Sequence, residues 1–323
     1  MSKVKMTFAS GLYDRMLALY TGDVKPEIID LTFVTVDHPR HIFDAQAKGP
    51  MYDASEMSAS EYITGTARGD RKFVAIPVFP SRLFRHGFIV INENNVRGPK
   101  DLNGKRIGVQ LYTMTAAVWI RGMLHEDYSF DATTVQWIEG SLTSGETYGT
   151  STTLPPGLNI IQNETGKSLD QLLVDGDIDA VIGAELPPRL GKVSHVRRLF
   201  PDFRDREKEY YKTQGIFPIM HVVVIRREIY DEFPEVASDL FKALCRSKEI
   251  GLQKMRFLST LRYMLPWLSS DLEEISEVCK DGDPWCYGLE ENRKTLEALV
   301  RYLVQQGMLP QTMALEELFV RCE

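Results

Sequence analysis

The sequence predicts an α/β protein with mainly parallel sheets, and three observations support this prediction. Short apolar or β-branched runs typical of strands alternate with segments of helical periodicity, joined by short connections. The chain has 323 residues, enough for two domains with separate hydrophobic cores. Polar loops follow several expected strands, and α/β sheets bind ligands at the carboxyl ends of their strands.

The charge and hydropathy of the chain exclude two classes of protein. A net charge of −7 argues against a nucleic-acid partner, so an anionic ligand would need a local positive site. No stretch reaches the length of a membrane span, and residues 1–9 lack the apolar run of a signal peptide. We therefore expect a soluble, cytoplasmic protein. Its four cysteines are expected to be reduced thiols, with a Cys279–Cys286 disulfide as the alternative.

The first third of the chain begins with a predicted strand at Val4–Phe8, a helix at Tyr13–Tyr20 and a strand at Ile28–Val36. A polar loop at Asp37–His41 follows. His38 and His41 could bind a metal, but without a third ligand nearby we interpret them as loop residues and predict no metal site. Ser58 and Glu61 have the spacing of a capping box, which places a helix start just after Ser58.

The stretch Pro77–Asn92 is the most informative part of the sequence. Its prolines indicate a loop, and Phe88–Ile91 is an apolar run typical of a buried strand. Four residues between them can donate hydrogen bonds to an anion: Ser81, Arg82, Arg85 and His86. A solvated surface loop is the plain alternative, but loops at strand ends commonly carry small-molecule sites.

The middle of the chain repeats the pattern of strand followed by polar loop. A strand at Arg106–Val109 precedes a helix that Thr113 or Thr115 is expected to cap, and Trp119 and Arg121 on that helix are ligand or core residues. Three further elements follow: a strand at Val135–Ile138, a long loop at Gly140–Gly157, and a helix at Ser168–Val174 capped by Ser168. The strand Ile178–Ala184 ends at Glu185.

The last third of the chain is predicted to be helical after one more strand. His221 precedes the apolar strand Val222–Ile225. Amphipathic helices are expected at Val236–Met255 and Leu289–Gln306. The simplest interpretation of their apolar stripes is that they pack into the hydrophobic core.

Four blocks carry a family resemblance: Tyr52–Ser58, Pro77–His86, Thr115–Gly122 and Gly215–His221. In this order they resemble the 4,5-dihydroxyphthalate decarboxylase family, which has the type 2 periplasmic-binding-protein fold. The resemblance implies two lobes with a ligand cleft between them. It places residues 1–92 and 217–323, with the C-terminal helices, in lobe 1, and residues 93–216 in lobe 2.

The same resemblance implies a non-oxidative decarboxylase, a carboxy-lyase of aromatic catabolism and phthalate degradation, converting 4,5-dihydroxyphthalate to protocatechuate and CO2. Two segments depart from the expected family pattern, Phe43–Ala45 and Glu139–Gly149. A related enzyme acting on another aromatic acid is therefore one alternative, and a solute-binding protein without catalysis is another. Expected partners are a small aromatic carboxylate and, as an open alternative, further copies of the chain, but no membrane.

The implied chemistry needs no electron-sink cofactor, because the aromatic ring of the substrate accepts the electrons. Binding of a divalent ion by the catechol oxygens of the substrate is an open alternative. Arg82 and Arg85 are expected to hold the retained carboxylate. His86 is the first choice for moving the proton at the ring carbon and His221 the second, with Glu185 or the other histidine as base. Either histidine could instead be structural. The remaining expected ligand-binding residues are Ser55, Ser58, Ser81, Thr113, Thr115, Trp119 and Arg121.

Overall fold

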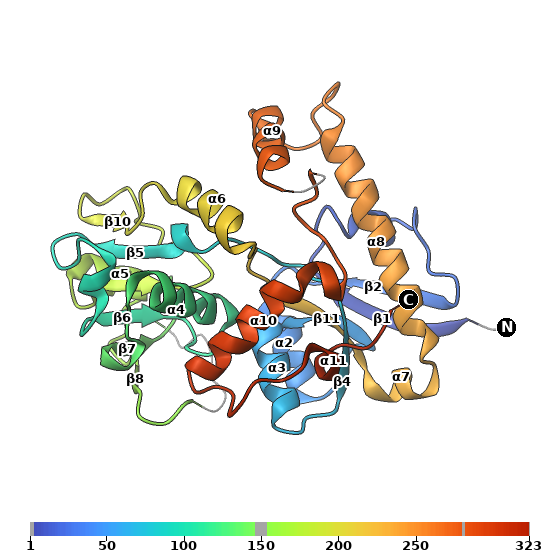
Figure 1. Ribbon diagram of the computed structural model, residues 1–323, viewed down its shortest axis with the longest axis horizontal. Coiled ribbons are helices and arrows are strands. Elements are labelled where there is room, and N and C mark those ends of the chain that lie inside the picture. The colour runs from blue at the N-terminus through green and yellow to red at the C-terminus, as the bar shows by residue number, and fades with distance from the viewer. Residues whose placement is uncertain (1–2, 146–153, 280–281, 323) are drawn as a thin grey trace. The chain divides into compact units, whose positions relative to one another are not determined.

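The computed structural model describes residues 3–145, 154–279 and 282–322, which form two compact units (Figure 1). Unit 1 comprises Met1–Arg82, Ile219–Leu296 and Met313–Glu323, and unit 2 comprises Leu83–Pro218 and Glu297–Thr312. Within the described ranges, no helix is both long enough and apolar enough to cross a bilayer.

Unit 1 contains a five-stranded mixed sheet in the order β2-β1-β3-β11-β4. β1 pairs in parallel with β2 and β3, whereas β11 runs antiparallel to both β3 and β4. The strands are β1 (Val4–Ser10), β2 (Ile29–Thr35), β3 (Ala54–Ser58), β4 (Phe73–Ile76) and β11 (His221–Arg226). The Val-Val-Val-Ile run of β11 is fully buried, as expected for an interior strand.

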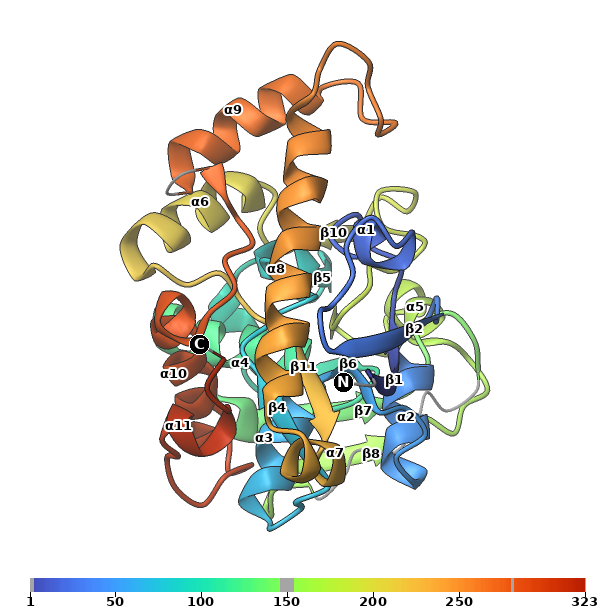
Figure 2. The same cartoon turned by 90° about the vertical axis from the view of Figure 1, so that its right-hand side faces the viewer.

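The helices of unit 1 include a long amphipathic helix, α8, whose buried residues extend from Val236 to Gly251. Figure 2 shows α8 running past the strands of its own unit. The others are α1 (Leu17–Tyr20), α2 (Pro39–Lys48), α3 (Ala59–Ala67), α7 (Arg227–Glu232), α9 (Leu268–Val278) and α11 (Leu315–Leu318). α8 spans Glu235–Arg256, and α10 (Leu289–Gln305) begins in unit 1 and continues into unit 2.

Unit 2 contains a six-stranded mixed sheet in the order β10-β5-β9-β6-β7-β8. β6, β7, β8 and β9 are parallel, and β5 runs antiparallel to both of its neighbours. The strands are β5 (Ile89–Asn92), β6 (Arg106–Val109), β7 (Gln136–Glu139), β8 (Asn159–Gln162), β9 (Ala180–Ile182) and β10 (Val196–Arg198). Its helices are η1 (His86–Phe88), η2 (Pro99–Leu102), α4 (Thr115–Tyr128), η3 (Ala132–Thr134), α5 (Leu169–Asp175) and α6 (Phe203–Gln214).

The helix-end predictions have mixed outcomes. At α5, Ser168 Oγ accepts a hydrogen bond from the Gln171 N–H at 3.2 Å, which confirms the predicted cap. The predicted helix start just after Ser58 is confirmed, because α3 begins at Ala59, but Ser58 provides no side-chain cap. The predicted cap of α4 by Thr113 or Thr115 is wrong, because Met114 occupies the N-cap position. Ser58 Oγ instead lies 3.3 Å from Ser60 Oγ.

The expected α/β class with mainly parallel sheets is confirmed, and one strand of each sheet runs against the others. These strands are β11 in unit 1 and β5 in unit 2, each the first strand after the chain passes between units. One local prediction needs correction. Asp37–His41 is not all loop, since α2 begins at Pro39 with His38 as its N-cap. Part of the predicted loop Gly140–Gly157 lies outside the described residues.

The division into units also differs from the domain boundaries predicted from the sequence. We expected the first crossing near residue 92, whereas unit 2 begins at Leu83. The reason is that β5 pairs with β9 and β10, so its hydrogen bonds place it in the second sheet. Residues Glu297–Thr312 also belong to unit 2, although the whole C-terminal part was assigned to lobe 1.

Candidate active site

A buried carboxylate and a histidine face each other at one edge of the unit 1 sheet. Glu56 lies on β3 and His221 opens β11. His221 Nδ1 lies 3.0 Å from Glu56 Oε2. Because β11 runs against β1 and β3, its first residue lies at the edge where those parallel strands end. This is the edge at which α/β sheets place their ligands.

Strand register explains why these two side chains meet. His221 pairs with Ser58, and Val223 pairs with Glu56. Residues two apart on a strand share a face, so His221 and Glu56 are diagonal neighbours on one face of the sheet. Both side chains are long enough to span that diagonal, and a one-residue slip would separate them.

Hydrogen bonds hold Glu56 in its ionised form despite complete burial. The residue has 0% exposure, and burial alone would raise its pKa. The hydrogen bond and charge of His221, the N–H of Gly11 and the hydroxyl of Tyr13 outweigh burial and hold the pKa of Glu56 below its usual value. An ionised Glu56 can only accept, so Nδ1 of His221 carries the proton in this pair.

The opposite ring nitrogen of His221 is available for chemistry. With Nδ1 engaged, Nε2 forms no hydrogen bond to any residue that the structure describes, and 15% of the side chain is exposed. Phe43 packs edge-on against the ring, with centroids 5.0 Å apart. The imidazole is therefore oriented by Glu56 on one side and Phe43 on another, while Nε2 is left for a ligand.

The loop after β1 completes the surroundings of the carboxylate. Gly11 donates its N–H to Glu56 Oε1 at 2.9 Å, and the Tyr13 hydroxyl lies 3.1 Å from each carboxylate oxygen. A Cβ at Gly11 would lie 2.6 Å from the Tyr13 ring, so only glycine fits. Burial, and then the charge of Glu56, raise the pKa of Tyr13, which keeps its hydroxyl protonated as a donor.

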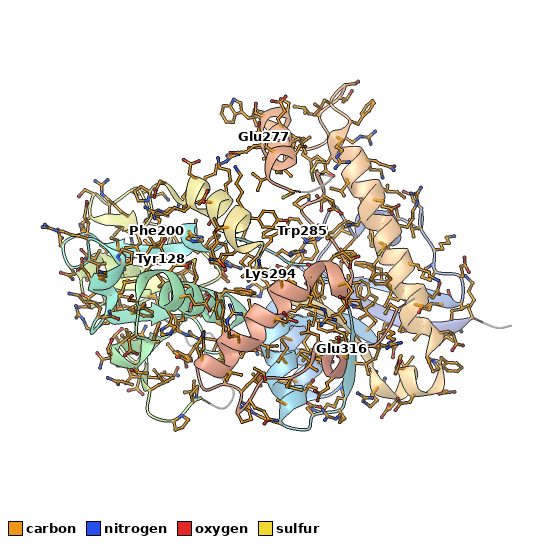
Figure 3. The ribbon with its side chains drawn as sticks, viewed as in Figure 1. Tyr128, Phe200, Glu277, Trp285, Lys294 and Glu316 are labelled. Atoms are coloured by element: carbon orange, nitrogen blue, oxygen red, sulfur yellow. The ribbon has the colours of Figure 1, made fainter. Side chains whose placement is uncertain are left out.

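Arg15 adds a cation beside this group. Its guanidinium lies 4.2 Å from the centroid of the Tyr13 ring and 4.8 Å from that of Trp285, which is labelled in Figure 3. It also donates hydrogen bonds to the carbonyl of Pro80. This stacking holds the guanidinium of Arg15 against the Tyr13 ring, whose hydroxyl contacts Glu56.

Two residues of the predicted loop, Ser81 and Arg82, lie alongside the start of β11. The Ser81 carbonyl accepts the backbone N–H of Met220 at 2.8 Å and that of His221 at 3.3 Å. Arg82 bridges to Ile219, is buried, and donates from Nη1 to the Cys286 carbonyl at 3.2 Å. The structure thus joins the Pro77–Arg82 loop to the backbone that carries His221.

Ser55 and Ser58 lie on opposite faces of β3, as residues an odd number of positions apart on a strand must. Ser58 shares the face of Glu56 and pairs with His221. Ser55 is completely buried on the other face, where Gln46 donates to its hydroxyl at 3.1 Å. Ser58 is therefore placed beside the Glu56–His221 pair, whereas Ser55 supports α2.

Unit 2 brings Arg85 and the end of β9 together. Arg85 is buried and donates from Nη1 to the Ala184 carbonyl at 3.2 Å. Burial lowers the pKa of Arg85 to about 9, and the charge of Glu207 only partly opposes this effect. The next residue, Glu185, is exposed and accepts a hydrogen bond from Gln110 at 3.3 Å. Arg85 is thus a desolvated cation held mainly by carbonyl groups.

His86 lies in an aromatic part of unit 2, with 2% exposure. Its ring packs edge-on against Phe200 and Tyr210, and Figure 3 labels Phe200 beside Tyr128. Burial, with a contribution from Arg206, lowers the pKa of His86 to about 4. Its imidazole is therefore neutral near pH 7. These surroundings suit packing better than the proton-transfer role that we predicted for His86.

The structure separates the helix residues of the predicted site. Thr113 and Thr115 are buried at the start of α4. Trp119 and Arg121 belong to the core: Trp119 packs on Tyr302, and Arg121 stacks on Tyr112 while bonding Gln306 Oε1 at 2.8 Å. The sequence left open whether these two residues contact a ligand or belong to the core, and the structure buries both within unit 2.

In the part of the chain that the structure describes, no group of three or more His, Cys, Asp or Glu side chains could hold a metal ion. The rings of His38 and His41 lie 5.4 Å apart, and His38 caps α2 through Nδ1. The four cysteines are free thiols, which excludes the alternative of a Cys279–Cys286 disulfide here.

Sequence reasoning missed three residues of this site: Tyr13, Arg15 and Glu56. A signal existed for the first two, because they follow the first strand at its carboxyl end. Glu56 lay within a block that we singled out, but only the strand pairing shows that β3 and β11 are neighbours.

Comparisons with solved structures define the class of protein. The chain matches the periplasmic aliphatic sulphonate binding protein SsuA of Escherichia coli with a TM-score of 0.50 at 14% identity, covering 100% of this chain and 93% of that one. A ligand-binding component of an import system from Staphylococcus aureus matches with a TM-score of 0.51 at 12% identity, over 99% and 97% of the two chains. The fold is that of the periplasmic binding proteins, which confirms the predicted fold family.

Comparisons with curated sequences identify the family. No protein-family model matches the chain. A 4,5-dihydroxyphthalate decarboxylase of Comamonas testosteroni is 34% identical over 322 residues, covering 99% of this chain and 97% of that protein. Another from Pseudomonas putida is 37% identical over 189 residues, 58% of this chain and 73% of the relative. The chain belongs to the 4,5-dihydroxyphthalate decarboxylase family.

Proposed function

We propose that this chain catalyses the non-oxidative decarboxylation of 4,5-dihydroxyphthalate to protocatechuate and CO2. Besides membership of the family, the observation that carries this proposal is the Glu56–His221 pair at the ligand-binding edge of the unit 1 sheet. The reaction removes one of two phthalate carboxylates and leaves a catechol acid. This places the enzyme in phthalate degradation.

The substrate itself supplies the electron sink. Each carboxylate is para to a phenolic hydroxyl, so electron density from that oxygen can move to the carbon bearing the carboxylate. Protonation of this carbon gives a dienone-like intermediate. Loss of CO2 returns the electrons of the broken carbon–carbon bond to the ring and restores aromaticity. The protein must therefore deliver one proton to carbon and hold the substrate in place.

The Glu56–His221 pair suits this proton transfer. In its doubly protonated form, His221 gives the Nε2 proton to the ring carbon and keeps the Nδ1 proton directed at Glu56. The buried carboxylate stabilises the imidazolium before transfer and fixes the ring orientation throughout. A solvent proton then restores His221, which balances the single proton that the overall reaction consumes. We therefore assign the proton donor to His221 rather than His86.

Cations are proposed to hold the substrate carboxylates. Arg82 adjoins the strand start that carries His221, and Arg15 is stacked beside Tyr13. Arg85 of unit 2 has carbonyl partners and only a partial counter-charge, so it gains most from a carboxylate ligand. Tyr13 remains a structural donor to Glu56 in this scheme.

The experiment is to incubate chelator-treated protein with 4,5-dihydroxyphthalate while following CO2 release and the ring spectrum. We expect equimolar CO2 and protocatechuate without added metal, because the ring needs no external electron sink. Protein carrying His221→Ala, purified identically, controls for contaminating activity. Absence of release both before and after addition of a divalent metal would contradict the proposed reaction. Release only after metal addition would contradict metal independence alone.

A further inference from the structure

The connection between α8 and α9 in unit 1 exposes six large apolar side chains, which we call the apolar tip. Met264 is 101% exposed and Trp267 is 75% exposed, and the other four are between 45% and 52%. The apolar tip comprises Phe257, Leu258, Leu261, Met264, Leu265 and Trp267. All six fall within eleven consecutive residues, so the exposed apolar side chains are concentrated in one short segment of unit 1.

The path of α8 explains why the patch is uncovered. The last fully buried residue of this 22-residue helix is Gly251, and its final turn to Arg256 buries none. Figure 2 shows the end of α8, the connection and α9 extending beyond the strands of unit 1. The apolar tip therefore lies where the helix has already left the core of its unit.

The exposed area is large for a monomer surface. Taking about 200 Å² for each large side chain, the apolar tip exposes on the order of 700 Å². The largest apolar patch on a typical monomer is about 300–600 Å² and often functional. A stable protein interface buries about 800 Å² on each partner. The apolar tip and its immediate surroundings thus provide the area that a stable dimer needs.

Charges around the apolar tip are self-complementary. Arg262 lies within the segment, 5.5 Å from the Phe257 ring, and forms no ion pair with a described carboxylate. Glu273 and Glu277 are exposed one turn apart on α9, and neither pairs with a cation in the described ranges; Figure 3 labels Glu277. The same arm of unit 1 therefore carries an apolar patch together with charges of both signs.

We propose that the apolar tip is the surface through which two copies of this chain associate. A two-fold axis brings the same patch of both copies together, and each cation on one copy can then meet carboxylates on the other. Arg262 of each copy faces Glu273 and Glu277 of the second copy, and the six apolar side chains are buried between them. A second copy supplies the apolar surface and the charges of both signs that this arm presents.

Sedimentation equilibrium of the full chain tests this association. At about 100 µM, a dimer with a micromolar dissociation constant is almost fully formed. We expect wild-type protein to be at least dimeric and the double variant Met264→Lys, Trp267→Ser to weaken association at least tenfold. The control is Met51→Lys, which places the same charge on another exposed methionine of unit 1. Far-UV circular dichroism verifies that all three proteins are folded.

A charge exchange tests whether the two copies meet through the proposed ion pairs. Arg262→Glu alone and the pair Glu273→Arg, Glu277→Arg alone should each weaken the dimer, because like charges then face each other. Mixing the two variant proteins should restore association as a heterodimer. A monomeric wild type, an unchanged assembly in the apolar-tip variant, or no recovery on mixing would each overturn the proposal.

Discussion

Nδ1 of His221 lies 3.0 Å from Oε2 of Glu56, and the glutamate is completely buried. The two residues are 165 positions apart in the chain and become diagonal neighbours through the antiparallel pairing of β3 and β11. A buried carboxylate fixes both the tautomer and the orientation of a histidine ring. Unit 2 buries two further basic residues, Arg85 and His86.

Replacing His221 by Ala should lower turnover by about 10² to 10⁴, because the general acid is lost. Substrate binding should be largely kept, which the rise in melting temperature on adding substrate reports. His41→Ala, at an exposed histidine of the same unit, is the matched control and should leave kcat unchanged. Wild-type kcat in His221→Ala would remove His221 from the reaction.

Replacing Glu56 by Gln should lower kcat by about 10² to 10⁴ with little change in KM. The amide N–H2 of Gln would donate to Nδ1, so the ring would lose its Nδ1 proton and the stabilisation of its charged form. A Glu56→Gln protein that is folded and has wild-type kcat would show that the carboxylate is only structural.

The Glu56→Gln variant also tests how the stability of the folded chain depends on pH. The pKa of Glu56 is lowered in the folded chain, so its ionisation adds stability above the ordinary glutamate pKa of about 4.3. That stability is lost as pH falls below this value towards the lowered pKa. The melting temperature of wild type should therefore exceed that of Glu56→Gln most near neutral pH, and the gap should narrow below about pH 4. A gap independent of pH would contradict an ionised Glu56.

Replacing His86 by Phe should make the protein more resistant to mild acid. The pKa of His86 is lowered to about 4, so between this value and about 6.5 the unfolded chain binds a proton that the folded chain does not. The free energy of unfolding is therefore not reduced by His86 above about pH 6.5. It falls by on the order of 3 kcal/mol as the pH drops towards 4.

Urea unfolding of wild type and His86→Phe at pH 7.5, 6 and 5 measures this difference. The wild type should lose more stability than the variant over that range, and parallel curves would be the contrary result. Turnover of His86→Phe should stay within about tenfold of wild type if His221 is the acid. A loss of about 10² or more would restore His86 as the proton donor.

Replacing Arg85 by Met should raise KM at least about tenfold without reducing stability. The guanidinium is buried with carbonyl partners and only a partial counter-charge, so its removal relieves a desolvation cost that its surroundings only partly offset. Michaelis constants and melting temperatures of Arg85→Met are compared with those of Arg197→Met, an exposed arginine of unit 2. An unchanged KM would exclude Arg85 as a carboxylate ligand.

The elements predicted best are those whose signal is local. The strands at β1, β2 and β6 and the helices α8 and α10 follow from periodicity, and the Ser168 cap follows from side-chain spacing. The predictions that are wrong concern residues whose local contacts compete with tertiary contacts. Glu61 has capping-box spacing, yet it pairs with Arg40 at 2.6 Å, so the cap that spacing favours does not form.

Trp119 and Arg121 show that tertiary contacts also limit the prediction of functional residues. Their positions in α4 matched a block of the family resemblance, but packing against α10 places them in the core of unit 2. His86 is similar: a histidine beside two arginines suggested acid–base chemistry, and burial among aromatic rings lowers its pKa to about 4. Exposure and neighbours decide such roles, and neither can be seen along the chain.

The sequence by itself determined the α/β class, most strands and helices, the family resemblance and the loop that carries Arg82 and Arg85, because each depends on residues close together in the chain. Only the tertiary structure decided that β11 lies beside β3 and that Glu56, Tyr13 and His221 form one group. The physical reason is that strand order and register are set by packing between distant segments. A one-residue change in register would place His221 and Glu56 on opposite faces of the sheet.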